Sequence, residues 1–346
     1  MSVVVLTTGG TIASVRESGD RIAVNRGRNP IRSLVDPDVR VREVMAVDSS
    51  TMSLPRMATI RKAVTETLAD ARVEGVVVLH GTDTMEETAM FLDLFHADPR
   101  PVVLTGAQRP ADDPDPDGPH NINAAVATAR RTGARDRGVL VVFGGRVLPA
   151  RVTRKAHTTQ LDAFQHYLPF SDDPRATLSW HPDIAQTRVD VVALHPGVDR
   201  AHIDASVAAG ARGIVVDAMG SGNANPNVLA AVEDCITSGI RVVVTSRVPD
   251  GVVEPIYGGD GGGHDLIRVG AIVSPWLRAG QARILLAALV AGGADHRLLV
   301  DAFADVVGLG DRCPVTGHRS AMILRLPVRL VDSYRWSRAL CKREPA

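Results

Sequence analysis

The first candidate for chemistry is a glycine-containing turn near the N-terminus. The segment TTGGTIAS, Thr7–Ser14, directly follows the apolar run Val3–Leu6 and contains the paired glycines Gly9 and Gly10. Paired glycines allow a tight turn and a close approach of the backbone to a neighbouring group. A phosphate loop is disfavoured, because the glycines lack the dinucleotide-binding spacing and no Gly-Lys-Ser/Thr sequence follows. The turn then either exposes the hydroxyl of Thr11 as a nucleophile, which needs activation, or is a structural strand-end turn.

A second polar turn follows another apolar run. In HGTDTMEETA, His80–Ala89, the hydroxyl of Thr82 stands beside the carboxylate of Asp83, and Gly81 permits a close approach. Thr82 could pass protons, and Asp83 could bind a substrate ammonium or orient Thr82. The alternative is a helix cap, for which Thr and Asp are favoured and which the following glutamates would support. A cap and a functional role are compatible.

Metal and thiol chemistry are disfavoured. Eleven histidines are present, but no HExxH sequence and no Cys/His pair at ligand spacing occurs, so we expect no metal and no cofactor. We interpret His80 and His120 as packed or hydrogen-bonded side chains. Cys235 lies in the helix-like segment AAVEDCITSG and is expected to be a buried thiol.

The candidate turns follow short β-branched runs that alternate with longer helical segments. Near-continuous apolar runs bounded by glycine are typical of strands buried on both faces of a parallel sheet, and ligands of such folds bind beyond the carboxyl ends of the strands. We therefore predict an α/β fold of two domains, each with a mainly parallel sheet flanked by helices. The predicted elements are strands at Val3–Leu6, Val41–Val47, Gly75–His80, Pro101–Gly106, Gly138–Gly145, Val189–His195, Gly213–Asn223, Arg241–Val248 and Gly270–Val273, and a helix at about Pro55–Ala71.

A polar, proline-containing segment separates two series of strands. We predict an N-terminal catalytic domain over 1–175, a linker over 176–188 and a C-terminal α/β domain over 189–310. Residues 311–346 are predicted to form a basic tail, since eight Arg and Lys stand against two acidic residues between Arg312 and Ala346. A solvated tail is the simpler interpretation, and a basic patch for an acidic partner is the alternative.

Length and composition exclude several classes of protein. With 346 residues, 45% of them hydrophobic and 23% charged, the chain has the composition of a globular protein of about two domains. Its 39 basic and 39 acidic residues cancel, so it lacks the electrostatic footprint of a nucleic-acid-binding protein. Three cysteines are too few for a disulfide framework, and no apolar run approaches the roughly 20 residues that span a bilayer. We expect a cytoplasmic protein that binds neither nucleic acid nor membrane.

Together, the two turns resemble the signatures of the L-asparaginase family, whose members hydrolyse amides with a threonine nucleophile. TGGTIA and HGTDTMEETA occur here in the order and spacing of that family. The similarity continues through PVVLTGAQRP, DGPHNI, RGVLVVFGGRVLPARVTRK, GSGNAN, RVPDG and QARILLAALV, and covers about residues 3–305. It implies hydrolysis without a cofactor, a small-molecule substrate and a homo-oligomer built from dimers that often pair into tetramers.

The resemblance implies roles for individual residues. Thr11 matches the family's nucleophile, and Thr82 and Asp83 match the threonine and the aspartate of the second signature. Ser49 matches the serine that holds the α-carboxylate of the substrate, and Ser50, also assigned to substrate binding, stands where a glutamine is frequent.

Two further matches concern the scissile amide and the assembly. Ala107, in TGAQRP, matches the residue whose backbone lies at the scissile carboxamide. Asn223, in GSGNAN, matches an asparagine that reaches the site of a neighbouring subunit.

One departure from the family concerns the proton path. Well-studied members carry a lysine shortly after the DGP motif, paired with the second threonine and the aspartate. Continuing without gaps from Asp117 places Thr132 at that position. We therefore expect proton transfer through Thr82 and ordered water. If the ungapped alignment is wrong, Lys155 is the remaining candidate in this domain besides Lys62.

Other departures concern substrate contacts. Gly258 occupies the position of a glutamate that binds the substrate ammonium in some members, and the lid segment 17–27 lacks the tyrosine that many members carry. We predict an L-asparagine amidohydrolase, which gives L-aspartate and ammonia through an acyl-threonine intermediate. The alternatives are a related enzyme for another small amide, such as glutamine, D-asparagine or a biosynthetic intermediate, and a non-catalytic ligand-binding protein.

Overall fold

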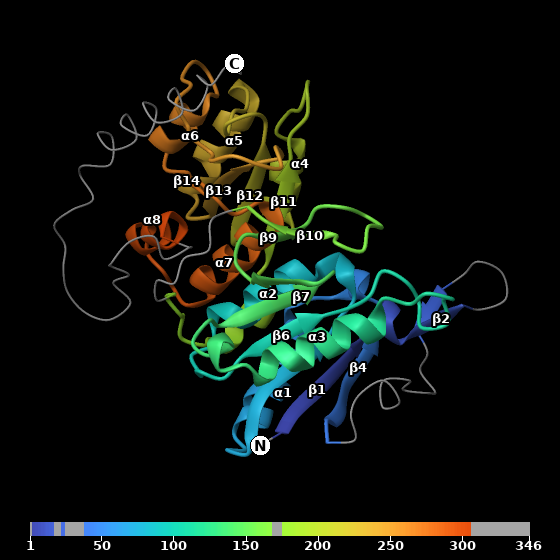
Figure 1. Cartoon of the computed structure of the whole chain (residues 1–346). Coiled ribbons are helices and arrows are strands. Elements are labelled where there is room, and N and C mark those ends of the chain that lie inside the picture. The colour runs from blue at the N-terminus through green and yellow to red at the C-terminus, as the bar shows by residue number, and fades with distance from the viewer. Residues whose placement is uncertain (1, 17–21, 25–37, 168–174, 306–346) are drawn as a thin grey trace, which may run out of the picture. The chain divides into compact units, whose positions relative to one another are not determined.

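The computed structural model describes residues 2–16, 22–24, 38–167 and 175–305 (Figure 1). The predicted basic tail over 311–346 and most of the predicted lid segment over 17–27 lie outside the described residues. Cys235 is buried and unbridged, as expected for a packed thiol.

The first sheet has six strands in the order β4-β1-β5-β6-β7-β8. All neighbouring pairs are parallel except β7 and β8, which are antiparallel. Because β1 lies beside β5, and β5 beside β6, the turns that follow these three strands meet at one edge of the sheet. The strands are β1 (Ser2–Gly9), β4 (Arg40–Val47), β5 (Val73–Leu79), β6 (Val102–Thr105), β7 (Val139–Phe143) and β8 (Arg146–Pro149).

Three helices cover this sheet: α1 (Leu54–Leu68), α2 (Met85–Leu94) and α3 (Gly118–Arg130). Val76 and Val78 of β5 belong to the buried cluster that contains α1 and α2. Val77 and Leu79 belong to the cluster that contains α3. Successive side chains of a strand point to opposite faces, so the uninterrupted apolar run of β5 results from helices on both faces of the sheet.

A tight hairpin reverses the chain after β7. Gly144 and Gly145 have φ angles of 55° and 77°, the left-handed conformation that a two-residue type I′ turn needs at both positions. The predicted strand Gly138–Gly145 therefore ends before its last two residues, and β8 returns beside it. The chain then enters a two-stranded antiparallel ribbon of β9 (Thr153–Lys155) and β10 (Phe164–His166).

The second sheet is fully parallel and has the order β11-β12-β13-β14. Ile214 and Val216 of β12 lie in a cluster with α5, whereas Val215 faces the opposite side of the sheet. The elements of this part are β11 (Val189–Ala193), β12 (Gly213–Ala218), β13 (Arg241–Ser246), β14 (Ile272–Val273), α4 (Ala201–Ala208), α5 (Pro226–Thr237), α6 (Gly263–Arg268) and α8 (His296–Ala304). A further ribbon pairs β2 (Ser14–Arg16) with β3 (Ile22–Val24) in the first part of the chain.

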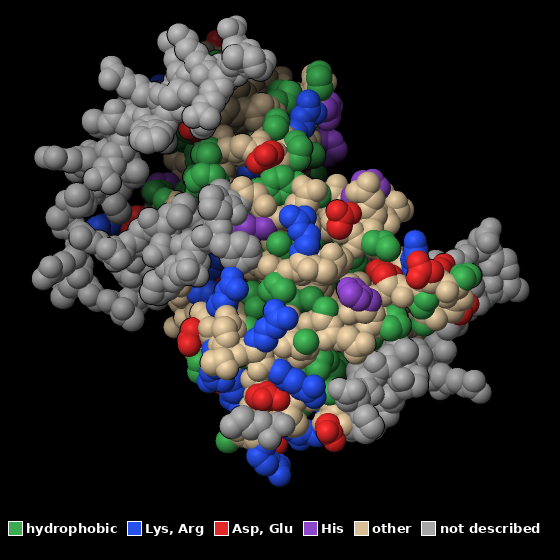
Figure 2. All heavy atoms as spheres, viewed as in Figure 1, with side chains coloured by type: hydrophobic (Ala, Val, Ile, Leu, Met, Phe, Trp, Pro, Cys, Tyr) green, Lys and Arg blue, Asp and Glu red, His purple; other side chains and the backbone are tan. Residues whose placement is uncertain are grey.

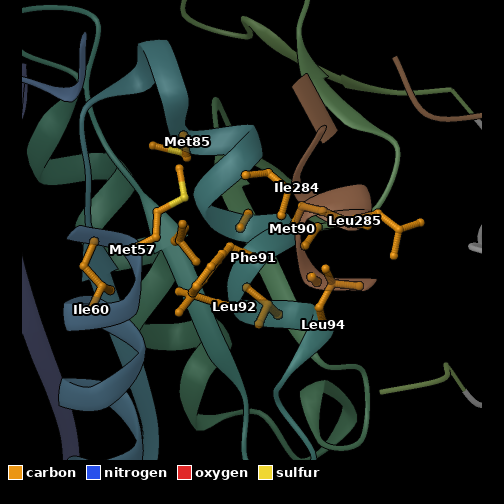
Figure 3. Close-up of a cluster of buried hydrophobic side chains, with 14 of the residues drawn as sticks. Met57, Ile60, Met85, Met90, Phe91, Leu92, Leu94, Ile284 and Leu285 are labelled. Carbon is orange, nitrogen blue, oxygen red and sulfur yellow. The ribbon is translucent and has the colours of Figure 1, made fainter. Parts of the chain in front are cut away.

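Helix α7 (Ala279–Ala291) contributes to both parts of the described structure. It packs against β11, β12 and β13, and also against α2. Figure 3 shows Ile284 and Leu285 of α7 facing Met90 of α2. All three side chains belong to one buried cluster, which also contains Val215 of the second sheet. The predicted α/β fold with two mainly parallel sheets is confirmed; the division at 176–188 stays a prediction.

Charges of both signs occur together on the surface. Figure 2 shows Lys and Arg side chains and Asp and Glu side chains on the same face, with apolar and uncharged atoms between them. This distribution agrees with the formal net charge of zero. None of the helices in the described part of the chain has the length and apolar character that a membrane crossing requires.

Candidate active site

The two signature turns touch through their glycines. Strands β1 and β5 are neighbours, and each ends just before one of these turns. A Cβ on Gly10 would lie 2.5 Å from both the Cα and the N of Gly81, so a side chain at Gly10 would force the turns apart. Gly10 also has a φ of 83°, which favours glycine. Since Thr11 follows one glycine and Thr82 the other, this backbone contact brings the two threonine turns together.

Each threonine begins a short 3₁₀ turn. Thr11 opens Thr11–Ala13 and is half-buried, whereas Thr82 opens Thr82–Thr84 and is buried. Asp83 is in the same turn as Thr82, but its side chain is 58% exposed. The site therefore has a buried hydroxyl next to a carboxylate that solvent or a ligand can reach.

Ser49 lies beside Gly81. A Cβ on Gly81 would come 2.5 Å from the Ser49 hydroxyl oxygen, and Thr84 donates a hydrogen bond to the Ser49 carbonyl at 2.9 Å. Ser49 is buried, whereas Ser50 is exposed and its hydroxyl donates to the carboxylate of Asp48 at 3.0 Å. The structure thus brings Ser49 to the threonine turns, while Asp48 holds the hydroxyl of Ser50.

Ala107 follows β6 at the same edge of the sheet and is buried. A Cβ on its neighbour Gly106 would lie 3.5 Å from Cγ2 of Thr82, so the two segments are adjacent. The carboxylate of Asp117 accepts the N–H of Gln108 at 3.0 Å and so fixes this turn. The Thr82 hydroxyl in turn donates to Oε1 of Gln108 over 3.3 Å. Sequence reasoning did not assign a role to Gln108.

A lysine lies at the site, contrary to the expectation from ungapped spacing. Nζ of Lys155 donates to Oγ1 of Thr82 at 2.8 Å and to Oδ1 of Asp83 at 3.0 Å. Thr132, in contrast, is exposed in the 3₁₀ turn Thr132–Ala134 after α3. The prediction for position 132 is wrong, because the chain brings its lysine to the site on β9, after the β7–β8 hairpin, and not on the helix that follows the DGP motif.

The sequence does contain a signal for Lys155. The chain has only three lysines, and Lys155 ends the segment RGVLVVFGGRVLPARVTRK that carries part of the family resemblance. Its contacts remove the reason for expecting a proton path without a nearby cation, since the Lys155 ammonium lies within hydrogen-bonding distance of both Thr82 and Asp83. The path through Thr82 and ordered water itself stays a prediction.

Glu86 holds the backbone of Lys155. Its Oε2 accepts the N–H of Lys155 at 2.6 Å. Burial, together with the neighbouring carboxylate of Glu87, raises the pKa of Glu86 above its ordinary value, and the hydrogen bond from Lys155 opposes that shift. Both glutamates are in the first turn of α2, as predicted, but Thr84 is at its N-cap position and no side-chain hydrogen bond caps the helix, so Thr82 and Asp83 do not form the predicted cap. The sequence did not indicate that the carboxylate of Glu86 would also accept a hydrogen bond from β9, the strand that ends with Lys155.

His80 is fully buried and supports the second turn. Its Nδ1 lies 2.7 Å from the carbonyl oxygen of Gly81, and its Nε2 lies 3.0 Å from the hydroxyl of Thr88. A carbonyl oxygen can only accept, so Nδ1 carries the proton and Nε2 accepts from Thr88. Burial lowers the pKa of His80 to about 4, so the ring is neutral at pH 7. The interpretation of His80 as a hydrogen-bonded side chain agrees with this geometry.

Asn223 lies at the β12–α5 connection of the second sheet. Its backbone pairs with Met219, and its side-chain oxygen accepts the N–H of Gly263 at 3.1 Å. Within the described residues of the single chain, no hydrogen bond joins Asn223 to the threonine turns. Gly258 is exposed in the loop that precedes α6.

The site combines two hydroxyls, a cation and a carboxylate. Thr82 accepts a hydrogen bond from Lys155, and its own proton makes the longer, 3.3 Å hydrogen bond to Gln108. Such a set can move a proton between hydroxyls and stabilise negative charge, which is the chemistry of nucleophilic acyl transfer. In the ranges that the structure describes, no group of three or more His, Cys, Asp or Glu side chains could hold a metal ion.

Comparison with known families covers both sheets. Residues 2–171 match the family described as "Asparaginase, N-terminal", and residues 188–303 match "Glutaminase/Asparaginase C-terminal domain". The first match contains every residue of the threonine turns and Lys155. The chain therefore belongs to the asparaginase family.

Several asparaginases are similar to this chain over most of their length. The L-asparaginase of Bacillus licheniformis is 32% identical over 306 residues, which cover 84% of this chain and 95% of that protein. L-asparaginase 2 of Escherichia coli (strain K12) is 32% identical over 311 residues, or 82% of this chain and 87% of that protein. The crystal structure of a probable cytoplasmic L-asparaginase from Campylobacter jejuni has a TM-score of 0.74 and 29% identity, covering 87% of this chain and 98% of that one.

Burial of His80 predicts a loss of stability in mild acid. The unfolded chain binds a proton at this histidine below a pKa of about 6.5, whereas the folded protein binds it only below about 4. Neutral His80 therefore contributes fully to the free energy of unfolding above pH 6.5. This contribution, about 3 kcal/mol in total, is lost as the pH falls toward 4. Urea unfolding of the wild type and of His80→Gln at pH 7.5 and pH 5 measures this loss. We expect the free energy of unfolding to change less between the two pH values in the variant than in the wild type.

His120→Gln is the matched control, because His120 is exposed. It should keep the wild-type difference in unfolding free energy between the two pH values. If the free energy of unfolding of His80→Gln changed between the two pH values as much as that of the wild type, buried His80 would not be the cause of the loss.

Proposed function

We propose that this protein is an L-asparagine amidohydrolase, which releases ammonia from the side-chain carboxamide and leaves L-aspartate. The observation that carries the proposal is the pair of hydrogen bonds from Lys155 to Thr82 and Asp83, at the turn that touches the turn of Thr11. Family membership and the similarity to the L-asparaginases of Bacillus licheniformis and Escherichia coli support this substrate. The cytoplasmic description of the Campylobacter jejuni relative supports the same location here.

Thr11 acts as the nucleophile in this proposal. Its hydroxyl oxygen attacks the carboxamide carbon and forms a C–O bond, while backbone donors near Thr82 and Ala107 stabilise the oxyanion. The Thr11 proton passes by way of Thr82 to the leaving nitrogen, the C–N bond breaks, and ammonia departs. Water then attacks the acyl-threonine ester, aspartate leaves, and Thr11 regains its proton.

Lys155 and Asp83 supply the charges for these steps. The ammonium of Lys155 stabilises negative charge on Thr82 when that hydroxyl gives up its proton. Asp83 balances Lys155, and its exposed side can bind the α-ammonium of the substrate. The buried Ser49, beside the same turn, binds the α-carboxylate.

We also propose that the enzyme is a homo-oligomer, a dimer or tetramer in which Asn223 reaches the site of another copy. The loop after β13 carries exposed apolar side chains, with Ile256 64% and Tyr257 57% exposed. The N–H of Ala224 donates to the carbonyl of Gly261 at 2.8 Å, so this loop lies beside the turn of Asn223. Exposed apolar side chains beside polar ones are typical of a subunit interface.

The reaction and its nucleophile are tested by ammonia release. We expect the wild type to act on L-asparagine more efficiently than on L-glutamine or D-asparagine, and Thr11→Ala to lower turnover by about 1,000-fold or more, because the covalent route is lost. Thr128→Ala, which removes a hydroxyl from α3, should keep wild-type turnover. A preference for another amide would support the alternative substrate, and no release from any amide would support a ligand-binding protein.

Lys155→Met should lower kcat by about 10- to 150-fold, since a hydrogen bond to a charged group contributes about 1.5–3 kcal/mol. Lys62→Met is the control, because Lys62 is 77% exposed on α1. Steady-state kinetics on L-asparagine give the kcat of each variant and show whether Lys155 contributes to turnover. Equal kcat values for both variants would show that Lys155 is not part of the catalytic machinery.

The assembly is tested by Ile256→Asp, which places a charge on the exposed apolar loop. We expect light scattering to show a smaller particle than the wild type, and activity to fall with it, because Asn223 no longer reaches a second site. Val207→Asp is the control, because Val207 lies on α4 and is 36% exposed. It should leave both the particle size and the activity unchanged. A wild-type monomer with full activity would contradict the role of Asn223.

A further inference from the structure

Gln281 of α7 is buried inside the first part of the structure, at 2% exposure. Its side-chain oxygen accepts the N–H of Val152 at 2.8 Å. Its Nε2 donates to the carbonyl oxygens of Ala150, Thr153 and Glu86 at 2.8, 3.0 and 3.2 Å. The side chain thus bonds only to residues far from its own helix, and it uses both its donor and its acceptor atoms.

The partners of Gln281 lie on both sides of the contact between Lys155 and Thr82. Thr153 begins the strand that Lys155 ends. Glu86 belongs to the helix turn that follows Asp83, and its carboxylate accepts the N–H of Lys155 at 2.6 Å. One amide from α7 therefore joins the segment that carries the ammonium to the segment that carries its two acceptors.

The turn before β9 is backbone-strained. Val152 has a φ of 62°, and a β-branched residue in the left-handed region is an outlier. Such a conformation persists only where its surroundings fix it. Gln281 fixes it from one side by accepting the N–H of Val152, and Arg151 fixes it from the other through its 2.7 Å bond to the buried carboxylate of Asp93. Loss of Gln281 would release a turn three residues before Lys155.

We propose that Gln281 is a positioning residue for Lys155: it holds the Ala150–Thr153 turn against the start of α2, so that the ammonium meets Thr82 and Asp83. The expected effect on turnover rests on the proposed function, whereas the effect on the place of Lys155 does not. A side chain of the helix that covers the second sheet thereby determines the geometry of a site on the first.

The small number of lysines allows the place of Lys155 to be measured without turnover. Brief acetylation with acetic anhydride, followed by peptide mass spectrometry, gives the labelling rate of each lysine. Lys62, 77% exposed, is an internal reference, whereas Lys155 is 17% exposed and hydrogen-bonded at its ammonium. In the wild type, Lys155 should react more slowly than Lys62.

In Gln281→Leu, we expect the labelling of Lys155 relative to Lys62 to rise severalfold. We also expect kcat on L-asparagine to fall about 10- to 100-fold, as for a misplacement of ~1 Å, with a smaller change in KM. Thr245→Val is the matched control for lost stability, because it removes a buried hydrogen bond to the carbonyl of Leu277, 2.6 Å long, in the second sheet. It should leave both the labelling ratio and kcat as in the wild type.

A labelling ratio that is the same in Gln281→Leu and Thr245→Val would overturn the proposal, whatever the stability of the two variants. If the wild type releases no ammonia from any amide while the ratio still rises in Gln281→Leu, the proposed function fails and the positioning role stands. Gln281→Glu keeps the acceptor for Val152 but loses both donors, and it provides the same measurement if the leucine variant does not fold. Its labelling ratio should also rise, and an unchanged ratio would count against the proposal.

Discussion

The close backbone contact between Gly10 and Gly81 is the constraint on which the rest of the site depends. It exists because β1 and β5 are neighbouring parallel strands that end side by side. A side chain at Gly10 would force the two turns apart, and a Cβ on Gly81 would collide with the side chain of Ser49, 2.5 Å from its hydroxyl oxygen. The positions of Thr11 and Thr82 therefore follow from the sheet, and the remaining polar groups are arranged around a fixed pair of turns.

Much of the fold could be predicted because local sequence and environment agree. The run of β5 is apolar at every position from Val76 to Leu79, since both of its faces are covered, and the glycines mark where strands end. The segment Thr82–Asp83 could be assigned both to a helix start and to chemistry, and it serves as the start of a helical segment in the structure. At such positions, residue type and spacing along the chain contain the information that the structure uses.

Lys155 could not be placed in this way. Distance along the chain does not show how the chain returns to a site, and here Gly144 and Gly145 reverse it, so that the lysine arrives on a short ribbon strand. Gln108 and Glu86 were missed for a related reason, because their partners come from distant segments. Gln281 begins the segment QARILLAALV that carries part of the family resemblance, but nothing in that segment indicates its partners, because only tertiary packing gives it four hydrogen bonds.

The shared position of α7 has a consequence for how the chain is made. The face of α2 that carries Met90 is covered by Ile284 and Leu285, which the ribosome adds nearly two hundred residues later. At synthesis rates of about 5–20 residues per second, that face of α2 stays uncovered for on the order of ten seconds or more before α7 is made. During this interval the nascent first sheet exposes an apolar surface, and a chaperone that shields it until Ala291 has emerged would protect the unfinished enzyme from aggregation.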